Sequence, residues 1–168
     1  AIGYEAGKTA QGSNSDAYGY QAGKEYQGNF SIAIGNQAGE FSQNNECTAI
    51  GYLAGQSYQD DNSLAIGVLA GTSYQSTESI AIGNNAGESN QSSQALSIGN
   101  YAGRLSQNTL CTSIGFRAGE SYQDNDSLAI GALAGTTRQS SQSMAIGNRS
   151  GEISQGRFSM AIGNFAGQ

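Results

Sequence analysis

Aliphatic, small and polar residues recur along this chain with a fixed period of sixteen residues. The segment 49–64 reads AIGYLAGQSYQDDNSL, and the rest of the chain consists of variants of it without an insertion or deletion. Ten full copies begin at Ala1, Ala17, Ala33, Ala49, Ala65, Ala81, Ser97, Ser113, Ala129 and Ala145, and a half copy covers 161–168. A fixed period of this length indicates a repeat architecture.

Large aliphatic residues stand at positions 16 and 2 of most copies, as Leu64 and Ile66 do, with a small residue such as Ala65 between them. Residues two apart share one face of a strand, so one face is aliphatic and the other nearly bare. We expect one strand over 63–67 and a second over 72–75, separated by turns. The sequence therefore predicts an all-β fold, a parallel β-solenoid (β-roll) with two short strands in each sixteen-residue coil.

Stacking of such coils at about 4.8 Å would give a rod of about ten and a half coils, roughly 50 Å long. We expect residues 1–168 to form a single repeat domain and to be a fragment of a longer array, because the chain starts inside the motif and stops halfway through a copy. The letters leave open whether the aliphatic stripe fills the coil or joins chains. A coil with one apolar stripe has little core of its own, so we expect a homo-oligomer.

Two glycine columns, at positions 3 and 7, hold all but three of the 25 glycines. Glycine at a fixed place indicates a positive φ or a close backbone approach, and two glycines four residues apart predict a tight turn in each copy. The turn glycines of the central copies are Gly35, Gly39, Gly51, Gly55, Gly67, Gly71, Gly83, Gly87, Gly99, Gly103, Gly115 and Gly119.

Position 11 is glutamine in every full copy, and we interpret this column as a structural ladder of stacked amides rather than a binding site. Its central members are Gln27, Gln43, Gln59, Gln75, Gln91, Gln107, Gln123 and Gln139. Position 10 holds a broken tyrosine row, which is either a contact surface for sugar or protein or a covered sheet face. Its members are Tyr26, Tyr58, Tyr74 and Tyr122.

A longer period of four copies is superimposed on the repeat, since the copy at 33–48 resembles 97–112 and the copy at 49–64 resembles 113–128. Block duplication explains this pattern, and equivalent partner contacts at every fourth coil would also explain it. Cys47 and Cys111 are related by the same period. The solenoid would separate them by about 19 Å along the axis, which excludes a disulfide between them within one chain. A disulfide between two chains remains an alternative.

Composition narrows the functional classes. A net charge of -6 and the lack of a basic patch argue against nucleic-acid binding. No apolar run reaches the length of a membrane span. The chain has no histidine for a catalytic triad and no complete phosphate loop, so we expect neither an enzyme nor a cofactor. The acidic turns at 60–62 and 124–126 are interpreted as solvated turns rather than calcium sites.

Four asparagines begin an Asn-x-Ser pattern and are candidate glycosylation sites, although serine is common enough for chance to produce them. They are Asn29, Asn90, Asn125 and Asn148.

The repeated sequences SIAIGNQAGEFSQ (31–43) and SLAIGVLAGTSYQ (63–75) resemble the AIGxxAG repeats of bacteriophage and giant-virus fibre proteins. They are also similar to the SxAIG head repeats of trimeric autotransporter adhesins, which form left-handed parallel β-rolls and assemble as trimers. The resemblance implies a non-enzymatic rod outside a cell or virion, on the cell or virion surface, that binds a glycan or surface receptor.

Two alternatives accompany this interpretation. Ice-binding and ice-nucleating solenoids also use short coils, but Thr9, Thr72, Thr77, Thr136 and Thr137 do not form an unbroken threonine column. Thermal hysteresis would identify that function. The second alternative is an end-to-end filament, because exposed sheet ends accept further strands.

Overall fold

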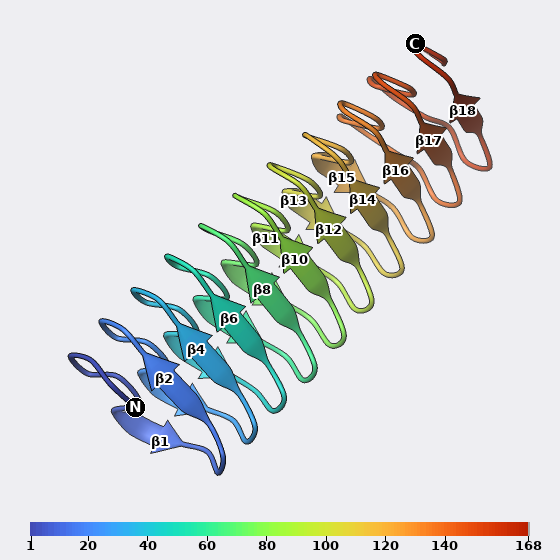
Figure 1. Cartoon of the computed structure of the whole chain (residues 1–168). Helices are drawn as coiled ribbons and strands as arrows, with labels where there is room; N and C mark the ends of the chain where they lie inside the picture. Colours follow the sequence, from blue (N-terminus) through green and yellow to red (C-terminus); the bar gives the residue numbers. More distant parts are fainter. Residues whose placement is uncertain (168) are drawn as a thin grey trace.

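The computed structural model describes residues 1–167 and is an all-β solenoid. The coils follow one another along a single axis, with the first and last coils at opposite ends of the rod (Figure 1). Strands of neighbouring coils pair in parallel with a shift of sixteen residues, so Ala65 pairs with Ala81 and Ile66 with Ile82. The predicted β-solenoid with two short strands per coil is confirmed. Within residues 1–167, no helix has the length and apolarity needed to cross a bilayer.

One strand of each coil joins a sheet of ten strands that extends over the whole rod. Each strand covers positions 16 to 2 of the repeat, two residues shorter than the predicted 63–67. The strands are β2 (Asp16–Tyr18), β4 (Ile32–Ile34), β6 (Thr48–Ile50), β8 (Leu64–Ile66), β10 (Ile80–Ile82), β12 (Leu96–Ile98), β14 (Thr112–Ile114), β16 (Leu128–Ile130), β17 (Met144–Ile146) and β18 (Met160–Ile162).

The second strand of each coil joins a sheet of eight strands. These strands are β1 (Thr9–Gln11), β3 (Glu25–Gln27), β5 (Phe41–Gln43), β7 (Ser57–Gln59), β9 (Ser73–Gln75), β11 (Ser89–Gln91), β13 (Leu105–Gln107) and β15 (Ser121–Gln123). In the next two coils the pairing continues only as single bridges from Gln123 to Gln139 and from Gln139 to Gln155. The second strand is therefore reduced near the C-terminal end of the described chain.

The interior of the rod is narrow and is filled by alanine, serine and glutamine side chains. Ala65, Ala70 and Gln75 of one coil are all buried, whereas Leu64 and Ile66 on either side of Ala65 are only partly covered. The same order of partly covered, buried and partly covered residues recurs in β6, β10, β12, β14, β16 and β17 of the ten-stranded sheet. Because successive side chains of a strand point to opposite faces, the aliphatic stripe lies on the outside of the solenoid. The sequence alone does not decide between an internal and an external aliphatic stripe, and the structure places the stripe outside.

The two glycine columns are needed for different reasons. A Cβ on Gly83 would lie 2.6 Å from the carbonyl oxygen of Gly99 in the next coil, so position 3 needs a close backbone approach. Gly87 has φ +51, and a Cβ there would lie 2.6 Å from Oε1 of Gln91 inside the coil. Leu69 also has a positive φ of 57, but it is not buried and its position tolerates a side chain. Glycine is thus kept where the interior or the next coil leaves no space.

Candidate functional site

The glutamine column forms a continuous ladder inside the rod. Nε2 of Gln43 donates to Oε1 of Gln59 at 3.1 Å, and Nε2 of Gln59 donates to Oε1 of Gln75 at 2.9 Å. The chain of amide bonds extends from Gln27 to Gln155. Since the glutamines between these ends are almost completely buried, the ladder is part of the core and not a surface for a ligand.

The same amides also satisfy backbone carbonyl groups across the coil. Nε2 of Gln75 donates to the carbonyl oxygen of Leu64 at 2.8 Å, and Nε2 of Gln91 does the same to Ile80. Where Ser97 replaces the interior alanine, its hydroxyl lies within hydrogen-bonding distance of Gln91 at 3.1 Å and also bonds Gln107. One side chain per coil therefore connects the two sheets and the neighbouring coils at the same time.

Both cysteines lie in the interior column at position 15 and are free. Sγ of Cys47 lies 2.9 Å from the carbonyl oxygen of Asp60, where Ser31 places its hydroxyl 2.6 Å from the equivalent carbonyl of Asn44. Burial raises the pKa of the Cys47 and Cys111 thiols. The prediction that they do not bond to one another is confirmed, and an interchain bridge would require a coil to open because both thiols are 0% exposed.

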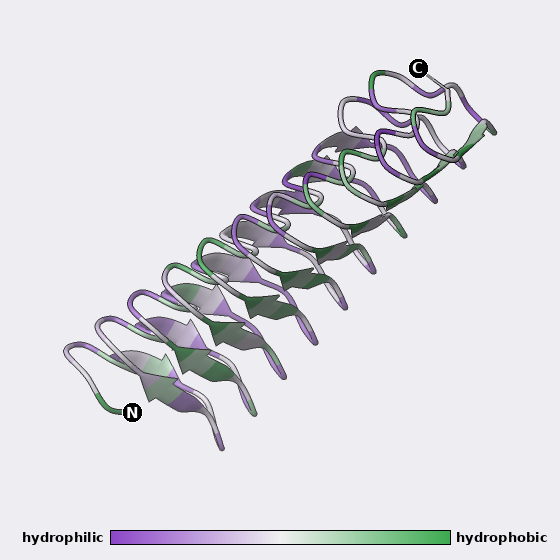
Figure 2. Ribbon diagram, turned by 45° about the horizontal axis from the view of Figure 1, so that its top comes forward, coloured by the Kyte–Doolittle hydropathy of each residue, from purple (hydrophilic) through white to green (hydrophobic). Residues whose placement is uncertain are grey.

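The outer side of the ten-stranded sheet is a continuous apolar surface, which we call the aliphatic face. Figure 2 shows it as a green sheet that follows the rod, opposite a sheet that is mostly purple or pale. It consists of Ile32, Ile34, Ile50, Leu64, Ile66, Ile80, Ile82, Leu96, Ile98, Ile114, Leu128, Ile130, Met144, Ile146, Met160 and Ile162. Only Asp16, Tyr18, Thr48 and Thr112 depart from the pattern. Contiguous apolar surface on this scale is typical of an interaction site.

The tyrosine row lies on the eight-stranded sheet, on the opposite side of the coil. Tyr58 and Tyr74 are 52% and 58% exposed, and their rings stack with centroids 5.1 Å apart and planes 2° apart. Tyr26 and Tyr122 lie in the same column and are similarly exposed. The structure therefore brings the predicted contact residues into one exposed column, and a contact role for them stays a prediction.

A second aromatic column at position 4 was missed by the sequence reasoning. Tyr4 and Tyr20 stack with centroids 5.3 Å apart, and Tyr52 and Phe116 are exposed in the same column. The signal was present in the sequence, because aromatic residues recur there with the same period of sixteen as at position 10.

A ridge of charged residues near positions 5 and 8 was also missed. Arg104 lies 2.8 Å from Glu88 and 3.5 Å from Glu120, which connects three successive coils. The hydrogen bond to Glu88 raises the pKa of Arg104 further above its ordinary value. At the first coil, hydrogen bonds from Lys8 and Gln21 lower the pKa of Glu5 to about 2. In each of these two clusters, acidic and basic side chains form ion pairs with one another, and we interpret both clusters as structural.

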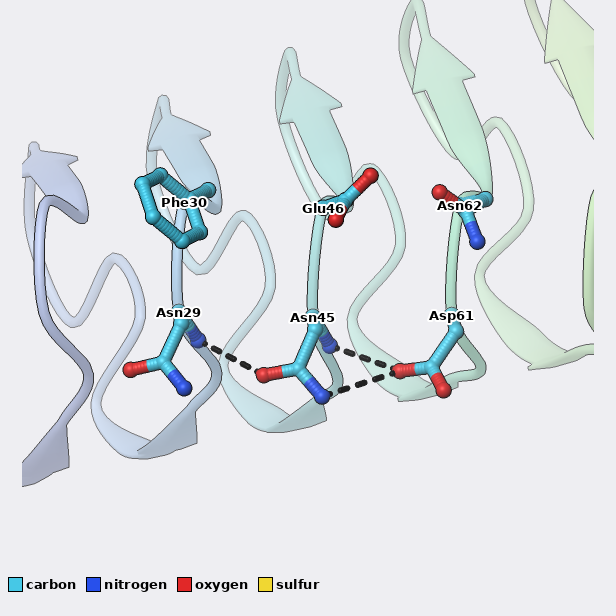
Figure 3. A pocket seen from close by; sticks show the side chains of 6 residues that line it. All are labelled: Asn29, Phe30, Asn45, Glu46, Asp61 and Asn62. Carbon is cyan, nitrogen blue, oxygen red and sulfur yellow. Dashed lines mark hydrogen bonds between the residues drawn. The ribbon is translucent and has the colours of Figure 1, made fainter.

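The acidic turn at 60–62 and the equivalent turns of the two preceding coils are joined by hydrogen bonds beside an open pocket (Figure 3). The backbone N–H of Asn29 donates to Oδ1 of Asn45 at 3.0 Å, and that of Asn45 donates to Oδ1 of Asp61 at 2.9 Å. Nδ2 of Asn45 reaches the same carboxylate oxygen at 3.3 Å. Phe30, Glu46 and Asn62 complete the lining. The carboxylate oxygen Oδ1 of Asp61 thus accepts two hydrogen bonds from Asn45, and the interpretation of this segment as a solvated turn stays a prediction.

The other predicted positions are dispersed over the surface. The candidate glycosylation residues Asn29, Asn90, Asn125 and Asn148 are all exposed, and their modification stays a prediction. The hydroxyls of Thr72 and Thr136 donate to the carbonyls of Leu69 and Leu133 within their own turns. Within the described part of the chain, no cluster of three or more metal-binding side chains is found.

Comparison of the chain with protein-family models, with curated proteins and with solved structures gives no match. The fold and the exposed faces are therefore the grounds for a functional proposal.

Proposed function

We propose that this chain is a non-enzymatic structural or adhesive rod that associates with copies of itself through the aliphatic face. The observation that carries the proposal is the position of the isoleucine and leucine columns outside a core made of alanine, serine and glutamine. An apolar strip on ten paired strands exposes side chains to water along most of the rod. Covering it with an equivalent strip removes that surface from water in both copies.

The opposite sheet supports a presenting role. Its tyrosine column remains free when the aliphatic face is covered, because the two sheets form opposite sides of the coil. Exposed tyrosines combine a large apolar ring with a hydroxyl group, a combination that suits binding to sugars or proteins. The resemblance of the repeats to fibre and adhesin repeats supports placing the rod outside a cell or on a virion, with a glycan or surface receptor as its partner.

The mass of the chain in solution tests self-association. Sedimentation equilibrium at micromolar concentrations is expected to give a discrete multiple of the 17.3 kDa chain mass, and negative-stain images should show separate short rods. Long fibres that grow at the rod ends would favour the filament alternative. A monomer at all concentrations would contradict the proposal.

A further inference from the structure

We propose that the aliphatic face binds a second copy in antiparallel orientation, with Thr48 of each copy opposite Thr112 of the other. This inference rests on the proposed self-association and adds the orientation and register of the pair. The observation behind it is the position of the only two threonines of the aliphatic face, which lie at the same repeat position in β6 and β14.

The two threonines are symmetric about one strand. In the ten-stranded sheet β8, β10 and β12 lie between β6 and β14, so β10 with Ile80 is the midpoint. The two threonines are four copies apart, which is the longer period of the sequence. Each places a hydroxyl among isoleucine and leucine side chains, and a hydroxyl covered by apolar surface without a hydrogen bond destabilises the contact. Covering the face is therefore favourable where each hydroxyl meets another polar group.

Two twofold arrangements bring the faces together, and they treat the threonines differently. A twofold axis along the rod keeps the rods parallel and reverses the strand direction, so the column of position 16 meets the column of position 2. Thr48 then lies against Ile50 of the second copy. A twofold axis along the strands reverses the rods and keeps the strand direction, so position 16 meets position 16 and like columns face each other. Only the second arrangement can pair hydroxyl with hydroxyl.

The position of the axis is also determined. An axis at β10 places β6 opposite β14 in both directions and forms two Thr48–Thr112 contacts. It overlaps every strand from β2 to β17 and leaves only β18 unpaired. An axis at β6 or at β14 would pair a threonine with its own copy once and would cover fewer strands. The polar strand β2, with Asp16, comes to the rim of the contact, where the carboxylate stays in water.

The proposed contact is a small interface. Overlapping strands of three residues, spaced by about 4.8 Å, give a flat strip of roughly 450 Å² per copy. Exposed side chains beside the strip, such as Tyr52, Val68 and Phe116, widen it. The flat strips of the two copies together cover roughly 900 Å², which is below the roughly 1,600 Å² of a standard specific interface and typical of a weak association. A polar contact inside such an interface fixes the register, as a single buried asparagine does in coiled coils.

Distances between spin labels on the full chain test the orientation. Cys47 and Cys111 are replaced by serine, and one label is attached at Tyr26→Cys or at Tyr74→Cys, both on the far sheet from the aliphatic face. The antiparallel pair separates the two copies of the label by about 32 Å along the axis at residue 26 and by about 4 Å at residue 74. Any parallel dimer or trimer gives the same distance at both sites.

The results separate this inference from the proposed function. A longer distance at residue 26 than at residue 74, with the axial difference expected, supports the antiparallel pair. A stable oligomer with equal distances overturns it and leaves self-association standing. A monomer overturns both. In Thr48→Ile/Thr112→Ile, we expect the oligomer to persist while the distance distributions broaden, because the register is no longer specified. Distributions as narrow as those of the unmodified face would contradict a role of the threonines.

Discussion

Nε2 of Gln59 donates to Oε1 of Gln75 at 2.9 Å, between two coils and inside a core that contains little aliphatic carbon. The rod is therefore stabilised by side-chain amide bonds and parallel backbone pairing where a larger domain would rely on isoleucine and leucine. Its large aliphatic residues remain available for a partner.

Replacing Gln75 by leucine is expected to lower the free energy of unfolding by about 3 kcal/mol or more. The substitution removes Oε1 of Gln75, which accepts from Nε2 of Gln59, and Nε2 of Gln75, which donates to Oε1 of Gln91. The buried amide groups of Gln59 and Gln91 each lose a hydrogen-bond partner. Urea unfolding followed by circular dichroism measures the change. Gln142→Leu is the matched control, because Gln142 is exposed, and it should stay within about 0.5 kcal/mol of the original chain. Equal effects of the two substitutions would show that the ladder contributes nothing.

The glycines at position 3, where the backbones of neighbouring coils approach closely, should tolerate substitution far less than the neighbouring residues with positive φ. Gly83→Ala places a Cβ 2.6 Å from the carbonyl oxygen of Gly99, so we expect a loss of about 3 kcal/mol or more, or a failure to fold. Leu69→Ala, at a position that already carries a side chain with φ 57, is expected to cost less than about 1 kcal/mol. Thermal unfolding of both variants makes the comparison. A Gly83→Ala chain as stable as Leu69→Ala would contradict the close packing of the coils.

The buried thiols predict slow alkylation and a defined pH dependence. Cys47 and Cys111 should react with iodoacetamide only after unfolding, since both are inaccessible. Their folded pKa lies above the ordinary value of 9.0, so the stability they contribute is complete below pH 9. Above it, the unfolded chain releases thiol protons that the folded chain retains, and stability falls by up to about 1.4 kcal/mol per pH unit for each thiol.

Cys47→Ser/Cys111→Ser supplies the control for this measurement, because serine is the usual residue of the column. We expect the stability of the original chain to fall more steeply than that of the serine variant between pH 8 and pH 10. If the stability of the two chains fell equally with rising pH, or if the folded chain were alkylated rapidly, the burial of the thiols would be contradicted.

The sequence predicts the coil well because the period has no insertion, and parallel pairing then places like residues over like residues. It does not reveal whether the interior of the coil is lined by Ala65 or by Leu64 and Ile66. The alternation of Leu64, Ala65 and Ile66 defines two faces, but the width of the interior depends on how sharply each coil turns. Four or five residues of each coil have a positive φ, Leu69 and Tyr74 among them, and they make the turns of the coil tight. Several of these positions carry leucine, tyrosine or glutamate, which rarely adopt that conformation, so residue type gives little warning of it.

The surface sites were only partly predictable. The tyrosine column at position 10 can be read from the letters, because its members recur at one position. The burial of Glu40, which is 3% exposed, depends on Lys24 and on amide groups of Gln37 and Gln56 around it. Such a network joins different residue types at different positions, and no single column of the repeat displays it.

The mass of Ile66→Lys/Ile82→Lys in solution tests the central claim most directly. If the aliphatic face is outside and binds a second copy, the variant should keep the circular dichroism of the original chain and sediment as a monomer with the mass of one chain, whereas the original chain sediments as an oligomer. Tyr58→Lys/Tyr74→Lys, on the opposite sheet, should fold and remain oligomeric. Unfolding of Ile66→Lys/Ile82→Lys would show that the isoleucines lie inside the coil, and an unchanged oligomer mass would show that this face does not hold the copies together.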